Sequence, residues 1–250
     1  MIIIKSQQEI AKMAIAGRIV AEILEELKKI IRPGVTTLDL DRHAEDFIAR
    51  KGARPAFKGY RSYPSAICAS INNQVVHGIP SASIVLTEGD IISIDIGVET
   101  DGFFGDAAVT LPVGAISEEA KRLLEVTEYA LYEGINRALP GRRLSDIGNA
   151  VQRYVEQNGY SVVRDFVGHG IGTSLHEEPQ IPNFGRPGEG PRLKPGMTLA
   201  IEPMVNMGNW AIEILKDNWT AVTKDGSLSA HFEHTVVVTD DKPEILTKIS

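Results

Sequence analysis

Two aspartates stand within one apolar stretch of the chain, IISIDIGVETDGFFGDAAVTL at residues 91–111. Asp95 and Asp106 lie on either side of Asp101-Gly102, a dipeptide typical of two-residue hairpin turns. The stretch is therefore predicted to form a β-hairpin. Carboxylates on an apolar sheet face are costly unless they are paired or bind a metal ion. A lone aspartate in a strand is more often structural, but for two on one hairpin metal binding is an equally good explanation.

The turn also sets which residues face each other across the hairpin. With a two-residue turn, Asp95 lies opposite Ala108, and Asp106 becomes its diagonal neighbour on the same sheet face. The two carboxylates would then reach one shared ion. A bulge at Gly105 would change this register, so the alternative stays open at this point.

Three more potential ligands lie in the second half of the chain. His169 stands among glycines in VGHGIG, where the backbone allows a close approach of ligands but the spacing is not that of a dinucleotide fingerprint. Glu202 follows the apolar letters MTLAI, and Glu233 lies inside LSAHFEHTVVV. Read as one strand, this last segment places His231 on the same face as Glu233 and His234 on the opposite face.

The candidate ligand set therefore has four carboxylates and one imidazole: Asp95, Asp106, His169, Glu202 and Glu233. Four carboxylates carry too much negative charge for one divalent ion, and they suit two ions bridged by carboxylates and a water. Oxygen ligands with a single histidine favour manganese, iron or cobalt over a closed structural zinc site.

The elements that must position these residues are predicted from hydrophobic spacing. Apolar residues recur with a helical period in four segments, which end at Pro-Gly or Gly signals: 9–31, 37–51, 117–138 and 144–158. Thr36 or Thr37 is expected to cap the second helix. Strands are expected at 65–71 and around Val75-Val76.

A repeat relates the two halves of the chain. Four features recur at an offset of 107 residues: Pro33-Gly34 and Pro140-Gly141, Gly52 and Gly159, Gly89 and Gly196, and Asp95 and Glu202. A duplication is predicted, with halves of about 8–112 and 117–240 inside a single domain of 1–250, and with Asp95 and Glu202 at one central site. Glu213 is the offset partner of Asp106, but its surroundings, NWAIEILKDN, are polar and turn-like, so it is left out of the site.

Composition limits the class of protein. The chain has 250 residues, 43% of them hydrophobic, and a net charge of −7, so a general nucleic-acid footprint is not expected. No distinct basic patch is visible, although the acidic balance leaves room for a local one. The single cysteine, Cys68, fits a reducing compartment, and neither a signal peptide nor a membrane-spanning run is seen. A soluble cytoplasmic protein is predicted.

The motifs together resemble one known family. IDIGVETDGFFGDAAVT, GHGIG, LHEEP, LAIEP and SAHFEHTVVVT, with SYPSAICASINNQVVHGIP, are similar to type I methionine aminopeptidases of the short bacterial form, within the M24 metallopeptidases. The resemblance runs from about residue 5 to about residue 245. It implies an α+β pita-bread fold, in which two pseudo-symmetric halves place an antiparallel sheet inside and helices outside. It also implies that the five candidate ligands hold two divalent ions, bridged by Asp106 and Glu233, with zinc as an alternative to cobalt, manganese or iron.

The resemblance further implies an activity and roles for other residues. A hydroxide bridging the two metals would release the N-terminal methionine of nascent proteins and peptides whose second residue is small. Catalytic roles fall to His77, His176 and Glu202, and the two histidines also contact substrate. The methionine pocket would consist of Tyr60, Tyr63, Cys68, Trp219, Phe57 and Leu175. Relatives often have cysteine in place of Phe57 and phenylalanine in place of Leu175, which leaves the exact shape of the pocket open.

Partners and a further ion are implied in the same way. Asn72, Gln74 and Ser229 match a position where relatives hold a monovalent cation. A monomer that meets the ribosome, with no membrane and no direct nucleic-acid specificity, is expected.

Other interpretations remain at this point. The chain could be an aminopeptidase P or prolidase, although those carry an additional N-terminal domain. It could also be an inactive pita-bread protein that only binds a partner, although all five ligands are present. Without the resemblance, the pocket aromatics would be ordinary core or surface residues. His43, His231 and His234 are interpreted as ordinary, and Cys68 as a pocket wall rather than a nucleophile.

Overall fold

In a computed structural model, which describes residues 1–249, the predicted helices are all present. They are α1 (Gln7–Ile30), α2 (Thr37–Arg50), α3 (Glu118–Ile135) and α4 (Ser145–Gln157). Ser6 and Thr36 cap the first two, each in a capping box with the acidic residue three positions later. Thr36, rather than Thr37, is thus the cap of α2. Within the described residues no helix is both long and apolar enough to cross a membrane.

The strands form one large and two small antiparallel sheets. In the large sheet the order is β1-β4-β5-β14-β9-β7-β8, with β2 on β4 and β15 on β14. Its strands are β1 (Arg54–Pro55), β2 (Cys68–Ile71), β4 (Ile91–Thr100), β5 (Phe103–Pro112), β7 (Gly168–Gly170), β8 (Glu177–Ile181), β9 (Thr198–Ile201), β14 (Glu233–Val237) and β15 (Glu244–Ile245). The small sheets contain β13 (Ser229–His231), β10 (Met204–Asn206) and β6 (Ser161–Val162), and β11 (Ile212–Ile214), β12 (Ala221–Thr223) and β3 (Gln74–Val76).

The predicted hairpin register is confirmed. Asp95 pairs with Ala108, and Asp106 pairs with Gly97, so the two aspartates are diagonal neighbours. Gly105 pairs with Val98 without a bulge. The alternation of β4 then turns residues such as Ile94 toward the helices and Asp95 toward the opposite face.

Two strand predictions are wrong in extent. The segment 228–238 is not one strand, because it breaks at Phe232 into β13 and β14, which belong to different sheets. The neighbouring chain breaks at the same level, where Pro203 has no N–H to continue a ladder and its carbonyl accepts the Phe232 N–H at 3.4 Å. The segment 65–71 becomes a strand only at Cys68, since the N–H groups of residues 66 and 67 donate to the Asp41 carboxylate instead.

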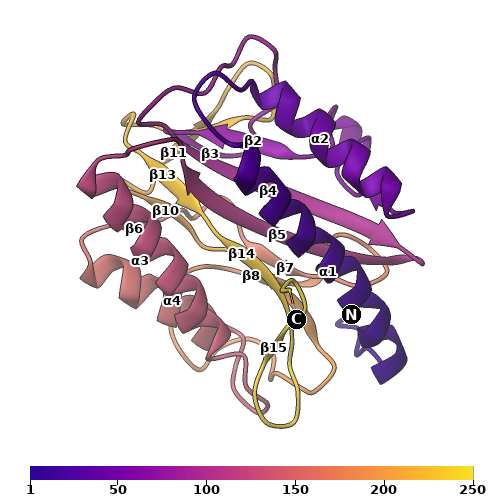
Figure 1. The fold of residues 1–250 in the computed structure, drawn as a ribbon. Coiled ribbons are helices and arrows are strands. Elements are labelled where there is room, and N and C mark those ends of the chain that lie inside the picture. Colours follow the sequence, from indigo (N-terminus) through magenta and orange to yellow (C-terminus); the bar gives the residue numbers. More distant parts are fainter. Residues whose placement is uncertain (250) are drawn as a thin grey trace.

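Helices cover one face of the large sheet (Figure 1), with α1 running across β4 and β5 and with α3 and α4 side by side near β14. Two apolar cores lie between these layers. One joins α1 and α2 to β4 through residues such as Leu27, Leu40 and Ile96. The other joins α3 and α4 to β9 through residues such as Leu123 and Val151. The face opposite the helices is left for polar side chains.

Glycines at the 107-residue offset share an unusual backbone conformation. Each adopts a positive φ, and the paired values are similar: 90° and 83° at Gly34 and Gly141, 69° and 85° at Gly52 and Gly159, and 93° and 86° at Gly89 and Gly196. L-residues with a side chain rarely adopt this conformation. The match supports the division into two related halves, 8–112 and 117–240, which stays a prediction.

The first helix lies unusually close to the hairpin. Gly17 of α1 faces Gly105 of β5, where an added Cβ on Gly105 would stand 2.7 Å from the Gly17 nitrogen and 2.9 Å from the Ala16 carbonyl carbon. Both neighbours are backbone atoms, so neither can swing away. The pair of glycines therefore sets how closely α1 packs on the strand that carries Asp106.

We expect Gly105→Ala to lower the free energy of unfolding by about 1–3 kcal/mol, the usual cost of overpacking. Ile15→Ala is the control, because Ile15 lies on the same helix but is 52% exposed. That change should stay within about 0.5 kcal/mol. Urea unfolding monitored by circular dichroism measures both. An unchanged stability for Gly105→Ala would show that the glycine contact does not limit the packing of α1.

Candidate active site

One pocket gathers every residue that the sequence placed at the site. Its lining comprises Phe57, Tyr60, Arg61, Tyr63, Cys68, His77, Asp95, Asp106, His169, Leu175, His176, Glu202, Trp219 and Glu233. Arg61 is the one lining residue that sequence reasoning missed. The pocket has a volume of about 130 Å³ and lies on the sheet face opposite the helices.

The five candidate ligands reach this pocket from separate elements. Asp95 and Asp106 come from β4 and β5, His169 from β7, Glu202 from the end of β9 and Glu233 from the start of β14. His169 Nε2 lies 3.5 Å from Glu202 Oε1 and 3.9 Å from Asp106 Oδ2. One ligand atom each of Asp106, His169 and Glu233 lies within 4.8 Å of the others, close enough to share an ion.

The carboxylates are buried without donors to satisfy them. Asp95 Oδ1, Asp106 Oδ1 and Glu233 Oε1 have no hydrogen-bond partner among the described residues. Burial raises the pKa of Asp95, Glu202 and Glu233 well above the usual range, and the neighbouring carboxylates raise it further. Burial also raises the pKa of Asp106 to about 7. Carboxyl oxygens without a hydrogen-bond partner are the ligands that hard divalent cations prefer once the protons have left, so the residues present fit a metal centre.

His169 is held in the form that a metal ligand requires. Its Nδ1 lies 2.9 Å from the Gly170 carbonyl oxygen, so Nδ1–H donates there and the lone pair of Nε2 faces the carboxylates. Burial, with a smaller effect of His176, lowers the pKa of His169 to about 3, which keeps the ring neutral.

Threonine hydroxyls fix β5 against β14 and β13 at this point. Thr235 of β14 donates its hydroxyl to the Asp106 carbonyl oxygen at 2.8 Å and accepts the Asp106 N–H at 3.0 Å. Thr110 of β5 does the same with the carbonyl and N–H of His231 in β13, at 2.9 and 2.8 Å. Since β5 and β14 share few backbone pairs, the Thr235 bonds extend their ladder and hold Asp106 beside Glu233.

His231 lies at the site, although its sequence context suggested an ordinary role. Its side chain is 1% exposed, its Nε2 is 3.8 Å from Glu202 Oε2, and neither ring nitrogen has a hydrogen-bond partner among the described residues. Burial lowers its pKa to about 3. The sequence signal for this position was the strand alternation, which predicted His231 on the same face as Glu233.

Aromatic contacts orient the two predicted catalytic histidines. The ring of His176 stacks on Tyr60 with centroids 5.1 Å apart and 18° between the planes. His77 meets Trp219 edge to face at 6.1 Å. Both rings are neutral, since burial lowers each pKa to about 4. A neutral imidazole keeps one N–H to donate and one nitrogen to accept.

A buried ion pair holds the loop that carries Leu175 and His176. The Glu177 carboxylate accepts the N–H groups of Thr173 at 2.8 Å and Ser174 at 3.2 Å, and it also accepts the ammonium of Lys5. The Lys5 and Glu177 side chains are 3% and 6% exposed. Sequence reasoning could not find this pair, because 172 residues separate the partners.

The remaining pocket residues form an apolar wall. Tyr63 packs edge to face on Trp219 at 5.0 Å and donates its hydroxyl to the Gly78 carbonyl at 3.0 Å. Cys68 is 4% exposed, and burial, reinforced by Asp95, raises its pKa well above the usual range. A protonated, buried thiol is a wall rather than a nucleophile.

The residues predicted to hold a monovalent cation lie outside the pocket. Asn72 and Ser229 meet through a bond from the Ser229 N–H to the Asn72 carbonyl at 2.9 Å, while the Gln74 side-chain oxygen accepts the Ile71 N–H at 2.9 Å. A monovalent cation there stays a prediction. Glu213 is exposed and away from the site, but it lies in strand β11 rather than in a turn.

Comparison with known proteins gives a consistent result. Methionine aminopeptidase 1 of Bacillus subtilis is 57% identical over 249 residues, which are 100% of both chains. Methionine aminopeptidase of Clostridium perfringens is 56% identical over 249 residues, again 100% of both. The crystal structure of methionine aminopeptidase from Thermotoga maritima superposes with a TM-score of 0.98 at 49% identity, covering 100% of both chains.

These similarities also settle the fold. It is the α+β pita-bread fold that the resemblance implied, with an antiparallel sheet inside and helices outside. The sequence model of the family described as "Metallopeptidase family M24" matches residues 11–240. Since this match spans most of the sequence, the chain belongs to metallopeptidase family M24.

Proposed function

We propose that this protein removes the N-terminal methionine from proteins and peptides by metal-dependent hydrolysis. The observation that carries the proposal is the union, in one pocket, of an anionic five-residue centre with a small apolar wall. The relatives named as methionine aminopeptidases support the same reaction.

The metal would be held by Asp95, Asp106, His169, Glu202 and Glu233, and we propose two divalent ions of manganese, iron or cobalt. When bound, such ions polarise a carbonyl and lower the pKa of a water. Glu202 lies within the ligand set and opens to the pocket, so its carboxylate would take the proton of the attacking water and deliver it to the leaving amine.

The two pocket histidines would act on the substrate directly. His176, fixed by Tyr60 and by the loop that Glu177 holds, would donate a hydrogen bond to the carbonyl oxygen as negative charge develops on it. His77 would hydrogen-bond the nitrogen of the scissile amide. Both roles need only a neutral imidazole with one N–H, the state in which burial keeps these rings.

The apolar wall would select the methionine side chain. Tyr60, Tyr63 and Trp219 offer ring edges and faces to the thioether, a contact worth about 0.3–1.5 kcal/mol. Phe57 and Leu175 complete this cluster, and both are buried. Substrates with a small second residue would be preferred, as the resemblance implies.

The setting of the reaction follows from its substrate. The N-termini of nascent proteins are the proposed substrates, and the ribosome that presents them is the proposed partner. A monomer in the cytoplasm would meet both.

The first test compares peptides from two reaction classes. Metal-free protein titrated with manganese, iron or cobalt should release methionine from Met-Ala-Ser and leave Ala-Pro intact, as measured by chromatography of free amino acids. Cleavage of Ala-Pro alone would indicate an X-Pro dipeptidase. Metal binding without cleavage of either peptide would move the function to partner binding.

The second test concerns the cost of the buried charges. In metal-free protein, Asp106→Asn should raise the free energy of unfolding by about 1–3 kcal/mol, because it removes one unsatisfied buried carboxylate. The same variant should lose the further rise in Tm that added manganese gives the unchanged protein. Calorimetry with and without manganese measures both effects. Glu213→Gln is the control, because Glu213 is the exposed residue 107 positions after Asp106. This change should alter neither the free energy of unfolding of the metal-free protein nor the rise in Tm with manganese. A destabilised Asp106→Asn protein would contradict the account of the site.

The third test concerns His176. His176→Ala should lower kcat by about 100- to 1,000-fold, the usual loss when one donor to a developing oxyanion is removed. Metal content, measured by atomic emission after dialysis, should not change. His43→Ala is the control, because His43 lies on α2 and does not line the pocket, and it should keep full activity. Loss of metal from His176→Ala would instead make His176 a ligand.

A further inference from the structure

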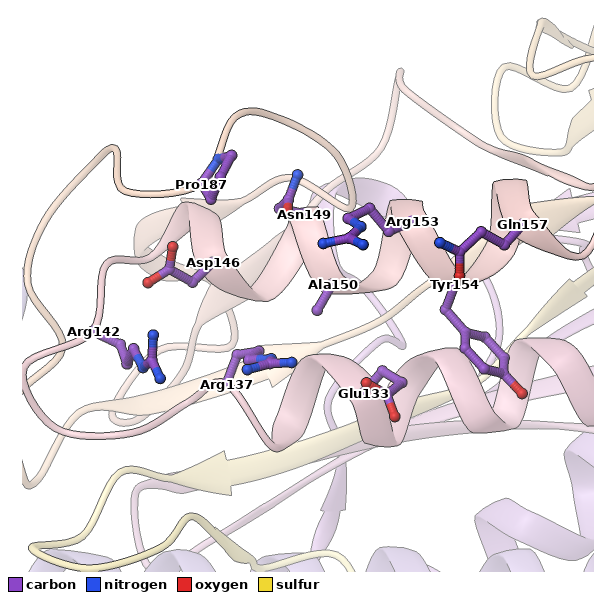
Figure 2. A pocket seen from close by; sticks show the side chains of 10 residues that line it. All are labelled: Glu133, Arg137, Arg142, Asp146, Asn149, Ala150, Arg153, Tyr154, Gln157 and Pro187. Atoms are coloured by element: carbon purple, nitrogen blue, oxygen red, sulfur yellow. The ribbon is translucent and has the colours of Figure 1, made fainter.

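A second pocket lies on the other side of the sheet, between α3 and α4 (Figure 2). It has a volume of about 340 Å³ and shares no lining residue with the active site. Its lining consists mainly of polar and charged side chains: Glu133, Arg137, Arg142, Asp146, Asn149, Ala150, Arg153, Tyr154, Gln157 and Pro187. The proposed peptidase reaction uses none of them.

Three arginines of this pocket form no contact ion pair, although Arg142 and Arg137 interact with the Asp146 carboxylate at longer range. Arg137 follows the end of α3, Arg142 lies in the loop before α4, and Arg153 projects from α4 (Figure 2). All three are exposed, and none forms an ion pair or donates a side-chain hydrogen bond to any of residues 1–249. Guanidinium groups without a carboxylate are available to bind a phosphate, which their fork of donors fits in a bidentate manner.

The nearest carboxylate offsets part of this charge but binds elsewhere. Asp146 lies in the first turn of α4, where Arg142 and Arg137 attract it electrostatically, but its two oxygens accept the backbone N–H groups of Arg143 at 3.0 Å and Gly188 at 2.8 Å. Its role is therefore to join the loop at residues 186–190 to the start of α4. Glu133 is the one other acid in the lining, so the pocket carries an excess of positive charge.

More arginines lie in the segments that border the pocket, where Glu189 is the exposed acid. Arg143 and Arg192 face each other in a β-bridge, and their guanidinium groups bind the carbonyls of Gly190 and Gly141 at 2.9 and 3.0 Å. Arg186 precedes Pro187 of the pocket lining and is exposed. The basic residues come from two segments, 137–153 and 186–192, which explains why no basic patch was visible along the sequence.

We propose that this α3–α4 pocket and its arginine rim bind the phosphodiester backbone of RNA. Guanidinium groups from the end of α3, the loop before α4 and α4 itself offer several contacts to a polymer of phosphates. Asn149 and Gln157 offer amide groups to ribose hydroxyls, and the ring of Tyr154 offers a surface for a base. The contrast with a net charge of −7 makes this the part of the molecule suited to a polyanion.

The test measures binding of a fluorescein-labelled RNA hairpin to the full chain by fluorescence anisotropy over a range of salt concentrations. The triple variant Arg137→Gln/Arg142→Gln/Arg153→Gln should weaken binding at least tenfold. The slope of log affinity against log salt should fall by about 2–3, close to one unit for each lost phosphate contact. Circular dichroism checks that the variant is folded.

A matched variant separates a site from general charge. Arg32→Gln/Arg42→Gln/Arg50→Gln removes the same charge from exposed positions in the first half, and it should keep at least half of the affinity. Equal weakening by the two triple variants would overturn the proposal, as would no binding by the unchanged protein. Tighter, arginine-dependent binding to phosphatidylglycerol vesicles than to the hairpin would assign the surface to a membrane instead.

The rate of peptide cleavage tests the proposed function separately from RNA binding. The pocket variant should release methionine from Met-Ala-Ser at the unchanged rate, because the two pockets share no residue. If the unchanged protein fails to cleave that peptide, the proposed function fails while the RNA result still decides this inference.

Discussion

Negative charges that are buried together repel one another, and much of this architecture serves to keep four carboxylates in one pocket. Asp95, Asp106, Glu202 and Glu233 come from four different chain segments, so no single element could hold them alone. The reciprocal bonds of Thr235 extend the ladder between β5 and β14 where backbone pairing is sparse. The apolar cores on the helix side supply the stability that this pocket lacks.

The metal ligands and the catalytic histidines are supported by different parts of the structure. Four of the five ligands lie on strands, where sheet pairing holds them rigidly, and Glu202 directly follows the end of β9. His77 and His176 lie on loops, where ring contacts orient them. The Lys5–Glu177 ion pair also holds the loop of His176. Rigid ligands and separately supported donors suit a reaction in which charge develops at a fixed position.

Much of the fold could be predicted from local signals. The caps and Pro-Gly stops of the helices and the Asp101-Gly102 turn are local signals, and the structure agrees with them. The four carboxylates of the pocket were recognisable because carboxylates in apolar strands are rare, whereas the apolar wall was predicted only from the family resemblance. The break at Phe232 was missed because it depends on Pro203, which lies between β9 and β10 and is distant in sequence. Arg61 and the arginines of the α3–α4 pocket were missed because exposed arginines are common in any sequence. Only the folded structure shows which of them lie close together.

The contact of α1 with distant segments has a consequence for how the protein is made. Gly17 packs against the backbone of Leu246, and Lys5 bonds to Gly196 and Glu177. The N-terminal segment can therefore pack on α2, β4 and β5 once the first half has been synthesised, but it completes its contacts only with the last residues of the chain. Contacts of such high sequence separation form late in folding.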